Sequence, residues 1–282
     1  MLLIRAPDHL GDGVMALPAI SALAAMAPCL IVAPRWGAAL YDGLGTILSR
    51  DASPKADVAV LLKPSLGAAW STRHIPRRIG LSTDARWWLL TDAVVPTQRH
   101  RIDDFAAVAR AAGAEVTGLP RYAPDGAAPS VPEDAVLLLP GTASPRTARW
   151  KNYRALADAL DGRAVFTGGP GDEEALAAIA GPHPILPILS LPDFSTLSAA
   201  VSAVVGNDSG LSHLAAAARR GHGADPADVH VVFGSTDPVR TGAPGATWHQ
   251  GVPPMCWPCY AKRCPWDAPC LSHPAQSVLD RL

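Results

Sequence analysis

The chain has 282 residues, of which 49% are hydrophobic and 17% charged, and its 24 Lys and Arg nearly balance its 25 Asp and Glu. This near-neutral balance excludes a globally basic nucleic-acid binder and an acidic solvating tail. The length favours two domains of about 100–150 residues, and 24 Gly and 28 Pro indicate many turns without the composition of low-complexity disorder.

Short aliphatic runs alternate with alanine-rich stretches as far as residue 233. This alternation is typical of α/β domains in which helices cover both faces of a parallel, doubly wound sheet. The expected elements, in chain order, are strand 2–5, helix 14–27, strands 30–33 and 57–62, helix 102–112, strand 135–139, helix 152–160, strand 164–167, helix 172–180, strand 203–206, helix 211–219 and strand 229–233.

The N-terminal segment does not resemble a targeting signal, because Arg5 and Pro7 interrupt its apolar run. No run approaches the roughly 20 apolar residues of a membrane-spanning helix. We therefore expect a cytoplasmic protein in which any membrane contact is peripheral.

A proline-rich stretch at 122–132 is the expected linker, because it has no periodicity and the strand–helix alternation restarts after it. We expect a Rossmann-like domain at 1–125, a second at 126–250 facing it across a cleft, and a Cys- and Pro-rich tail at 251–282. The first domain has 13 basic and 11 acidic residues, whereas the remainder of the chain has 11 and 14.

An arginine-rich stretch lies in the first domain between residues 73 and 101, with six arginines, no lysine and two acidic residues. Guanidinium groups match the geometry of carboxylates and phosphates. The stretch therefore favours a site for an anionic partner, with Arg77, Arg78 and Arg101 as candidates. The alternative is an ordinary solvated face.

The first strand leads into a loop at 6–13 that contains Gly11, Asp12 and Gly13. Glycine lets a backbone approach a ligand, and open α/β sheets bind ligands at the carboxyl ends of their strands. Asp12 is therefore a candidate catalytic residue and Gly11 a candidate binding residue. The alternative is that Asp12 caps the helix expected from Val14. The loop lacks GxGxxG spacing, so a dinucleotide cofactor is not indicated.

A second candidate site follows the strand at 203–206, where Asn-Asp-Ser-Gly leads directly into a helix. The N–H groups and dipole at a helix start suit a phosphate group, and glycine permits close approach. The candidate binding residues are Asp208, Ser209, Gly210 and His213. The alternative is a capping turn at Asp208 or Ser209 with His213 packed against it.

Three further strand ends open into polar loops that contain glycine, at 139–149, 166–172 and 233–238. Several such loops at the edge of one sheet predict a site for a nucleotide diphosphate, although one alone would be weak evidence. The carboxylate that ends the second loop suits ribose hydroxyls. The candidate residues in these loops are Thr142, Arg146, Arg149 and Asp172.

Four of the five cysteines, Cys256, Cys259, Cys264 and Cys270, lie close together near the C-terminus. Four such thiols are able to hold a zinc ion. Their spacing lacks two well-separated Cys-x2-Cys pairs, however. We therefore favour free or paired thiols that pack the tail, and keep a metal site as the alternative.

Taken together, these motifs resemble glycosyltransferase family 9, the ADP-heptose:lipopolysaccharide heptosyltransferases. The resemblance runs along almost the whole chain. It rests on LGDGVMALPAI at 10–20, RRIG at 77–80, WWLLT at 87–91, LPG at 139–141, RW at 149–150, NDSGLSHLAAA at 207–217, VFGSTDP at 232–238 and the four-cysteine tail.

The resemblance implies a GT-B fold and an inverting, metal-independent glycosyltransferase that requires no cofactor and uses an ADP-sugar as donor. It implies that Asp12 is the general base for the acceptor hydroxyl. On the donor side it implies a diphosphate-binding loop at Ser209, Gly210 and His213, with Asp208 near the donor sugar and Asp172 at the ribose. Ala148 departs from the family, which commonly has a phosphate-contacting Lys there; Arg146 and Arg149 are candidates to replace it.

We therefore expect transfer of a heptose or related sugar to an anionic, lipid-linked acceptor of the lipopolysaccharide type at the inner face of the cytoplasmic membrane. In this hypothesis Arg77, Arg78 and Arg101 hold the acceptor's carboxylates or phosphates. The alternatives are a GT-B enzyme that acts on another sugar nucleotide, such as a UDP-sugar, and a non-catalytic nucleotide-sugar binder.

Overall fold

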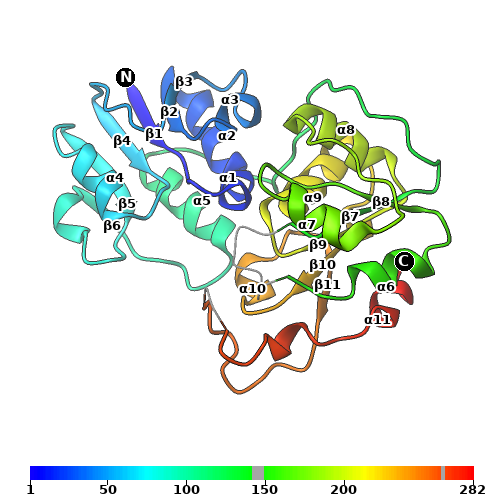
Figure 1. The fold of residues 1–282 in the computed structure, drawn as a ribbon. Helices are drawn as coiled ribbons and strands as arrows, with labels where there is room; N and C mark the ends of the chain where they lie inside the picture. The colour runs from blue at the N-terminus through cyan, green and yellow to red at the C-terminus, as the bar shows by residue number, and fades with distance from the viewer. Residues whose placement is uncertain (142–148, 262–263) are drawn as a thin grey trace. The chain divides into compact units, whose positions relative to one another are not determined.

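The computed structural model describes residues 1–141, 149–261 and 264–282. The chain forms two compact units, Met1–Pro120 and Arg121–Leu282, coloured in chain order in Figure 1. Each unit is built on a wholly parallel sheet between helices, so the predicted α/β class is confirmed.

The sheet of the first unit has six strands in the order β3-β2-β1-β4-β5-β6. Its central strand β1 is buried throughout, and Leu3 lies opposite Leu30 on one side and Ala59 on the other. The chain moves outward from β1 to β3 and then returns to the far side of β1, so its direction switches between β1 and β4. The strands are β1 (Leu2–Arg5), β2 (Cys29–Ala33), β3 (Thr46–Ser49), β4 (Val58–Leu61), β5 (Arg77–Leu81) and β6 (Asp92–Val94).

Two layers of helices pack on this sheet. In one layer, Ala69 of α4 and Leu89 of the 3-10 helix η1 share a buried cluster with Leu3 and Leu61 of the sheet. In the other, α5 packs against α1, α2 and strands β4–β6. The helices are α1 (Leu10–Met15), α2 (Leu17–Met26), α3 (Gly37–Leu40), α4 (Leu66–Ser71), η1 (Trp87–Leu89) and α5 (Arg101–Ala111).

The sheet of the second unit has five parallel strands in the order β11-β10-β9-β7-β8. Here the chain runs from β7 to β8 on one side and then crosses to β9 on the other, so the direction switches between β7 and β9. The strands are β7 (Val136–Leu139), β8 (Ala164–Phe166), β9 (Ala203–Asn207), β10 (Val229–Phe233) and β11 (Thr247–Gln250).

The C-terminal segment belongs to the core of the second unit. Cys270, Leu271 and Val278 are buried in one cluster with Trp150 of the β7–α6 connection and with residues of β7, β8 and β9. Helices α8 and α9 pack closely against each other. The helices are α6 (Tyr153–Ala159), α7 (Glu173–Ala180), α8 (Leu191–Ala200), α9 (Gly210–His222), η3 (Pro226–Asp228), α10 (Pro238–Thr241), η4 (Pro269–Leu271) and α11 (Gln276–Leu279).

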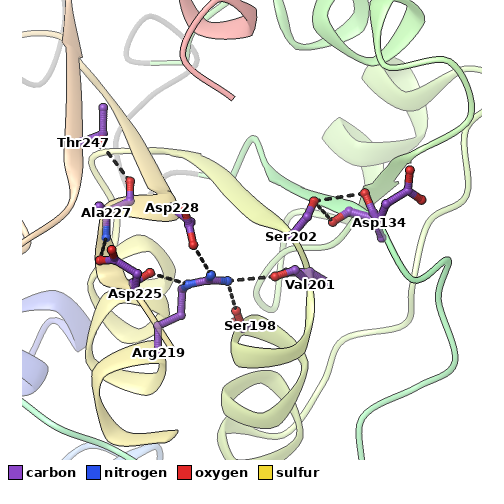
Figure 2. A network of polar contacts seen from close by, with 10 residues as sticks. Asp134, Ser198, Val201, Ser202, Arg219, Asp225, Ala227, Asp228 and Thr247 are labelled. Atoms are coloured by element: carbon purple, nitrogen blue, oxygen red, sulfur yellow. Dashed lines mark hydrogen bonds and ion pairs between the residues drawn. The ribbon is translucent and has the colours of Figure 1, made fainter. Parts of the chain in front are cut away.

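A buried arginine holds the C-terminal part of α9 in place (Figure 2). Arg219 donates to the carbonyl oxygens of Ser198 (3.0 Å) and Val201 (2.8 Å) at the end of α8, and to that of Asp225 (2.7 Å). It also pairs with the carboxylate of Asp228 in η3. One guanidinium thereby joins three elements, which fixes the direction of α9 and hence the position of its N-terminus.

Some predicted boundaries were wrong. The helix predicted from Val14 begins at Leu10 and is split into α1 and α2, and the helix predicted at 211–219 extends to His222. The strands β3, β5, β6 and β11 and helix α8 had no predicted counterpart. The missed strands lack a long aliphatic run, because they are short or contain charged residues. For example, β5 begins with Arg77.

Within the described ranges, no helix is both long and apolar enough to cross a bilayer.

Candidate functional site

The first candidate site lies where β1 ends, at the switch between β1 and β4. His9 is the N-cap residue of α1, so Gly11 and Asp12 lie in the first helical turn and not in a loop. The prediction of a loop through residue 13 was therefore wrong, and so was the alternative that Asp12 caps the helix. The helix brings the Asp12 carboxylate to the carboxyl edge of the sheet, where open α/β sheets bind ligands.

Arg101, the first residue of α5, lies beside this carboxylate. Its Nε is 3.5 Å from Oδ1 of Asp12, and the two side chains are 25% and 27% exposed. The guanidinium also stacks over Phe105, 5.3 Å from the ring centroid, which limits its freedom. The pair is thus held in a defined orientation while remaining accessible to a ligand.

Gly13 is required by packing beneath α1. A Cβ atom at this position would lie 2.4 Å from Trp36 and 2.9 Å from the hydroxyl of Tyr41. That hydroxyl donates to the Gly13 carbonyl at 3.3 Å. Burial, and secondarily the charge of Asp12, raises the pKa of Tyr41 far above its usual value, so Tyr41 remains a neutral donor.

Three charged residues at the same edge were missed by sequence reasoning. Oδ2 of Asp8, just after β1, is 2.6 Å from Nζ of Lys63 and 2.9 Å from Arg50. Lys63 follows β4 and Arg50 follows β3, so each lies at a strand's carboxyl end. The position of Lys63 after the predicted strand 57–62 was the available signal, whereas Arg50 follows a strand that was not predicted.

The structure does not bring Arg77 and Arg78 to this edge, because they begin β5 and so lie at its amino end. Arg77 pairs with Asp92, which raises the pKa of Arg77 and lowers that of Asp92. Arg78 donates to the carbonyl oxygens of Leu89, Ile75 and Pro76. Both guanidinium groups therefore have partners within the unit, and their assignment to an acceptor stays a prediction.

The second candidate site lies at the switch between β7 and β9, where α9 begins. Ser209 is the N-cap residue of α9, but its side chain makes no capping hydrogen bond, and Gly210 opens the helix. The first backbone N–H groups of this 13-residue helix lie at the carboxyl edge of the sheet and donate no hydrogen bond to the Ser209 side chain. Such a helix start favours a phosphate group.

Asp208 and His213 flank this helix start. Oδ2 of Asp208 accepts a hydrogen bond from Thr236 at 2.6 Å, and Oδ1 lies 3.5 Å from Nε2 of His213. His213 is buried, and its backbone N–H donates to the carbonyl oxygen of Ser209 at the start of the helix. Thr236 follows β10, so the loop at 233–238 contacts Asp208 at this edge, and its part in a nucleotide site stays a prediction.

Asn207, at the end of β9, was a residue that the sequence analysis did not select. Its side-chain amide donates to the carbonyl of Pro140 at 2.9 Å and accepts from the N–H of Trp150 at 3.2 Å. It therefore fixes both ends of the loop that leaves β7. Its place in the Asn-Asp-Ser-Gly motif was the signal, but its role depends on the adjacency of β7 and β9.

Arg149 and Asp172 meet at the same edge. Arg149 donates from Nε to the Pro140 carbonyl at 2.7 Å, and its other end lies 3.8 Å from Asp172. Asp172 accepts from the N–H of Gly169 at 3.0 Å, and a Cβ at Gly141 would lie 2.1 Å from its carboxylate. The predicted candidates Thr142 and Arg146, like Ala148, lie outside the described residues.

The sequence matches glycosyltransferase family 9 (heptosyltransferase) over residues 52–266. The chain belongs to this family. No curated protein sequence matches the chain.

Solved structures resemble this family 9 member in fold at low sequence identity. ADP-heptose LPS heptosyltransferase II of E. coli has 21% identity and a TM-score of 0.74, covering 99% of this chain and 96% of its own. E. coli heptosyltransferase WaaC with ADP has 18% identity and a TM-score of 0.70, covering 99% and 98%. A family 9 glycosyltransferase from Veillonella parvula has 18% and 0.65, covering 88% and 84%. These likenesses support the expected GT-B fold.

The four C-terminal cysteines of this family 9 chain are free thiols that line one small pocket together with Ser235. Burial raises the pKa of Cys270, and the neighbouring Cys259, Cys264 and Cys256 raise it further. Among the residues described, no group of three or more His, Cys, Asp or Glu side chains is arranged to hold a metal ion. The preference for free or paired thiols over a metal site stays a prediction.

Proposed function

We propose that this glycosyltransferase transfers a heptose from ADP-heptose to an anionic, lipid-linked saccharide of the lipopolysaccharide type, with inversion at the anomeric carbon. The family match supports sugar transfer, and the E. coli structures with the same fold are named for ADP-heptose, LPS or ADP. Of the two switch-point sites in this chain, the one in the first unit has groups suited to proton transfer. The one in the second unit has groups suited to binding a diphosphate.

On the acceptor side, Asp12 removes the proton of the acceptor hydroxyl as that oxygen attacks the anomeric carbon of the donor. The carboxylate is partly exposed and oriented by Arg101. Arg101, together with Lys63 and Arg50 at the same edge, provides positive charge for the acceptor's carboxylates or phosphates. Gly11, in the first turn of α1, stays a predicted acceptor-binding residue.

On the donor side, the bond between the anomeric carbon and the diphosphate oxygen breaks, and ADP leaves. The N-terminus of α9, at Ser209 and Gly210, stabilises the charge on the leaving diphosphate, and the guanidinium of Arg149 binds the diphosphate of the donor. His213 supports the loop, Asp172 takes the ribose hydroxyls, and Asp208 lies near the donor sugar. Thr142 and Arg146 stay predicted ligands.

We propose that the reaction needs no bound divalent cation and no cofactor. Both carboxylates of the donor site are already engaged, Asp208 by Thr236 and Asp172 by Arg149 and Gly169. Cationic and N–H groups provide the charge stabilisation that a metal ion supplies in other transferases. Activity in the presence of EDTA equal to that without it is the expected result.

The observation that carries the proposal is the start of α9, where Ser209 makes no capping hydrogen bond, at the switch between β7 and β9 in a chain of this family. Thermal unfolding with ADP, UDP or GDP tests the donor, because a ligand that binds only the native state raises Tm. We expect ADP to give the largest increase. A larger increase with UDP would contradict the heptose assignment in favour of another sugar nucleotide.

Transfer itself is tested with ADP-heptose and a lipopolysaccharide-type acceptor that lacks the heptose. The expected product carries a heptose whose anomeric configuration is opposite to that of the donor, as measured by NMR. Binding of ADP without transfer to any such acceptor would favour a non-catalytic binder.

A further inference from the structure

One layer of the first unit, formed by α4 and η1, exposes large aromatic side chains. Trp70 on α4 is 52% exposed, and Trp87 and Trp88 on η1 are 63% and 56% exposed. Leu66, the first residue of α4, is 51% exposed. Single exposed apolar side chains are ordinary, but three tryptophans and a leucine on one layer indicate a surface that is covered in function.

The two elements share a buried underside and therefore form one surface. Ala69 of α4 and Leu89 of η1 lie in the same buried cluster with strands β1 and β4. Arg86, which is fully buried, donates to the carbonyl oxygens of Lys63 (3.1 Å) and Leu81 (2.9 Å). This arginine ties the residue before η1 to the connection that leads into α4.

A second arginine closes the other side of the layer. Arg78 donates from Nε to the Leu89 carbonyl in η1 at 2.7 Å, and from its terminal nitrogen to the carbonyl oxygens of Ile75 and Pro76, which follow α4. The exposed tryptophans are thus mounted on a framework that two guanidinium groups hold together. We call Leu66, Trp70, Trp87 and Trp88 the aromatic layer.

One exposed positive charge lies on the aromatic layer itself. Of the other basic residues between 63 and 101, Arg86 is buried, and Lys63, Arg77 and Arg101 are paired with Asp8, Asp92 and Asp12. Arg73 is exposed and lies over the ring of Trp70, 4.6 Å from its centroid, with a hydrogen bond to the Trp70 carbonyl. Tryptophan beside arginine is the composition that favours the headgroup region of an anionic bilayer.

We propose that the aromatic layer docks the enzyme on the surface of an anionic lipid bilayer. The tryptophan rings enter the interface between headgroups and acyl chains, and Arg73 pairs with lipid phosphates. The bilayer is chosen over a protein partner because the layer combines three exposed tryptophans with an exposed arginine on one of their rings. The inference also rests on the proposed function, in which the acceptor is lipid-linked.

Docking has a kinetic consequence for the proposed reaction. A lipid-linked acceptor is confined to the bilayer surface, so an enzyme bound to that surface meets it at a higher effective concentration than an enzyme in solution. The aromatic layer therefore lowers the apparent KM for acceptor in a membrane and leaves the KM for a water-soluble acceptor unchanged.

The test uses the full chain and sedimentation with vesicles of phosphatidylcholine, with or without phosphatidylglycerol. We expect the wild-type chain to bind the anionic vesicles and the variant Trp87→Ser/Trp88→Ser to lose about tenfold in partition coefficient. Arg73→Glu is expected to weaken binding mainly at low salt. The matched control is Trp266→Ser in the second unit, because Trp266 is 66% exposed and lies outside the layer.

Each outcome either supports or overturns the docking proposal. A loss in the double variant, with Trp266→Ser equal to wild type and with circular dichroism unchanged, supports the proposal. The proposal is overturned if the wild type fails to bind anionic vesicles, if the double variant and the wild type partition equally, or if Trp266→Ser shows an equal loss. The first of these results leaves a protein as the occupant.

A transfer assay separates this inference from the proposed function. The double variant is expected to lose transfer to the acceptor in vesicles but not to the same acceptor after deacylation, which is water-soluble. No transfer to either form by wild type contradicts the proposed function and leaves the vesicle result standing. Equal transfer by wild type and double variant to the vesicle-bound acceptor contradicts the docking surface alone.

Discussion

The two units use the same topological position for different chemistry. At the switch between β1 and β4, the first unit gathers ionisable side chains, Asp8, Asp12, Lys63 and Arg101. At the switch between β7 and β9, the second adds the N-terminus of α9 and a buried amide to the charged pair of Arg149 and Asp172. A partly exposed carboxylate suits proton transfer, whereas N–H groups at a helix start suit the binding of a diphosphate. On the proposed function, one architecture used twice thus gives a catalytic half and a binding half.

The strongest test of this division is Asp12→Asn. The amide keeps the size of the side chain but cannot take a proton, so we expect kcat to fall by about 10²- to 10⁴-fold, with ADP binding unchanged by calorimetry. Asp103→Asn, in the same first turn of α5 as Arg101, is the control and keeps its activity. Near-normal turnover by Asp12→Asn would remove the general base from the first unit.

The next largest effect is expected from Arg219→Met, which acts on the second unit alone. It leaves three backbone carbonyls and Asp228 without their buried donor, at a cost of roughly 3 kcal/mol in unfolding free energy. Urea unfolding measures the loss, and a high concentration of ADP restores part of it. Arg154→Met, which breaks an exposed pair with Asp158, is expected to cost under about 1 kcal/mol. Equal losses in the two variants would show that the Arg219 network does not hold α9.

Acidification is a third way to weaken the second unit. His230 and His249 are buried against each other, 2.9 Å apart, and burial lowers their pKa values to about 4 and about 3. Between pH 6.5 and 4 the unfolded chain therefore binds more protons than the folded one, so stability falls as pH falls.

From pH 7 to pH 5 this linkage amounts to about 2 kcal/mol for each histidine. Urea unfolding at the two pH values measures it. His249→Phe is expected to show a smaller difference between pH 7 and pH 5 than the wild type. An unchanged difference in that variant would place the acid sensitivity elsewhere.

The smallest effect is expected from Arg149→Gln, which reports on the binding role alone. Loss of one charge beside the diphosphate is expected to raise the donor KM by about tenfold with a smaller change in kcat. Lys151→Gln is the control, since Lys151 is exposed and pairs with Asp267. A fall in kcat without a change in KM would move Arg149 from ground-state binding to transition-state stabilisation.

Local sequence was sufficient to predict features that lie within one short segment of the chain. The aliphatic runs of β1 and β7 and the Asn-Asp-Ser-Gly start of α9 were predicted because strand, turn and helix follow each other directly. The start of α1 was not, because Gly11 and Gly13 suggested a loop. Gly13 is needed instead by Trp36 and Tyr41, which are more than 20 residues away.

The parts of the sites that depend on strand order could not be predicted. Lys63 and Arg50 meet Asp8 only because β4 and β3 are placed as they are in the sheet. Asn207 gains its role because β9 pairs with β7. Arg77 and Arg78 show the converse. They belong to the same arginine-rich stretch as Arg101, yet they lie at the opposite edge of the sheet. Composition alone indicated an anionic partner without indicating which guanidinium faces it.

The burial of residues 268–278 in the second unit bears on the order in which the two halves mature during synthesis. All six strands of the first sheet lie within residues 2–94, so the first unit is able to form while the rest of the chain is being made. The second core closes only when Leu271 and Val278 arrive. His273 then accepts hydrogen bonds from Trp150 and Asn152, beside the loop that Asn207 holds. A nascent chain is thus able to form the unit that carries Asp12 well before the core of the second unit is complete.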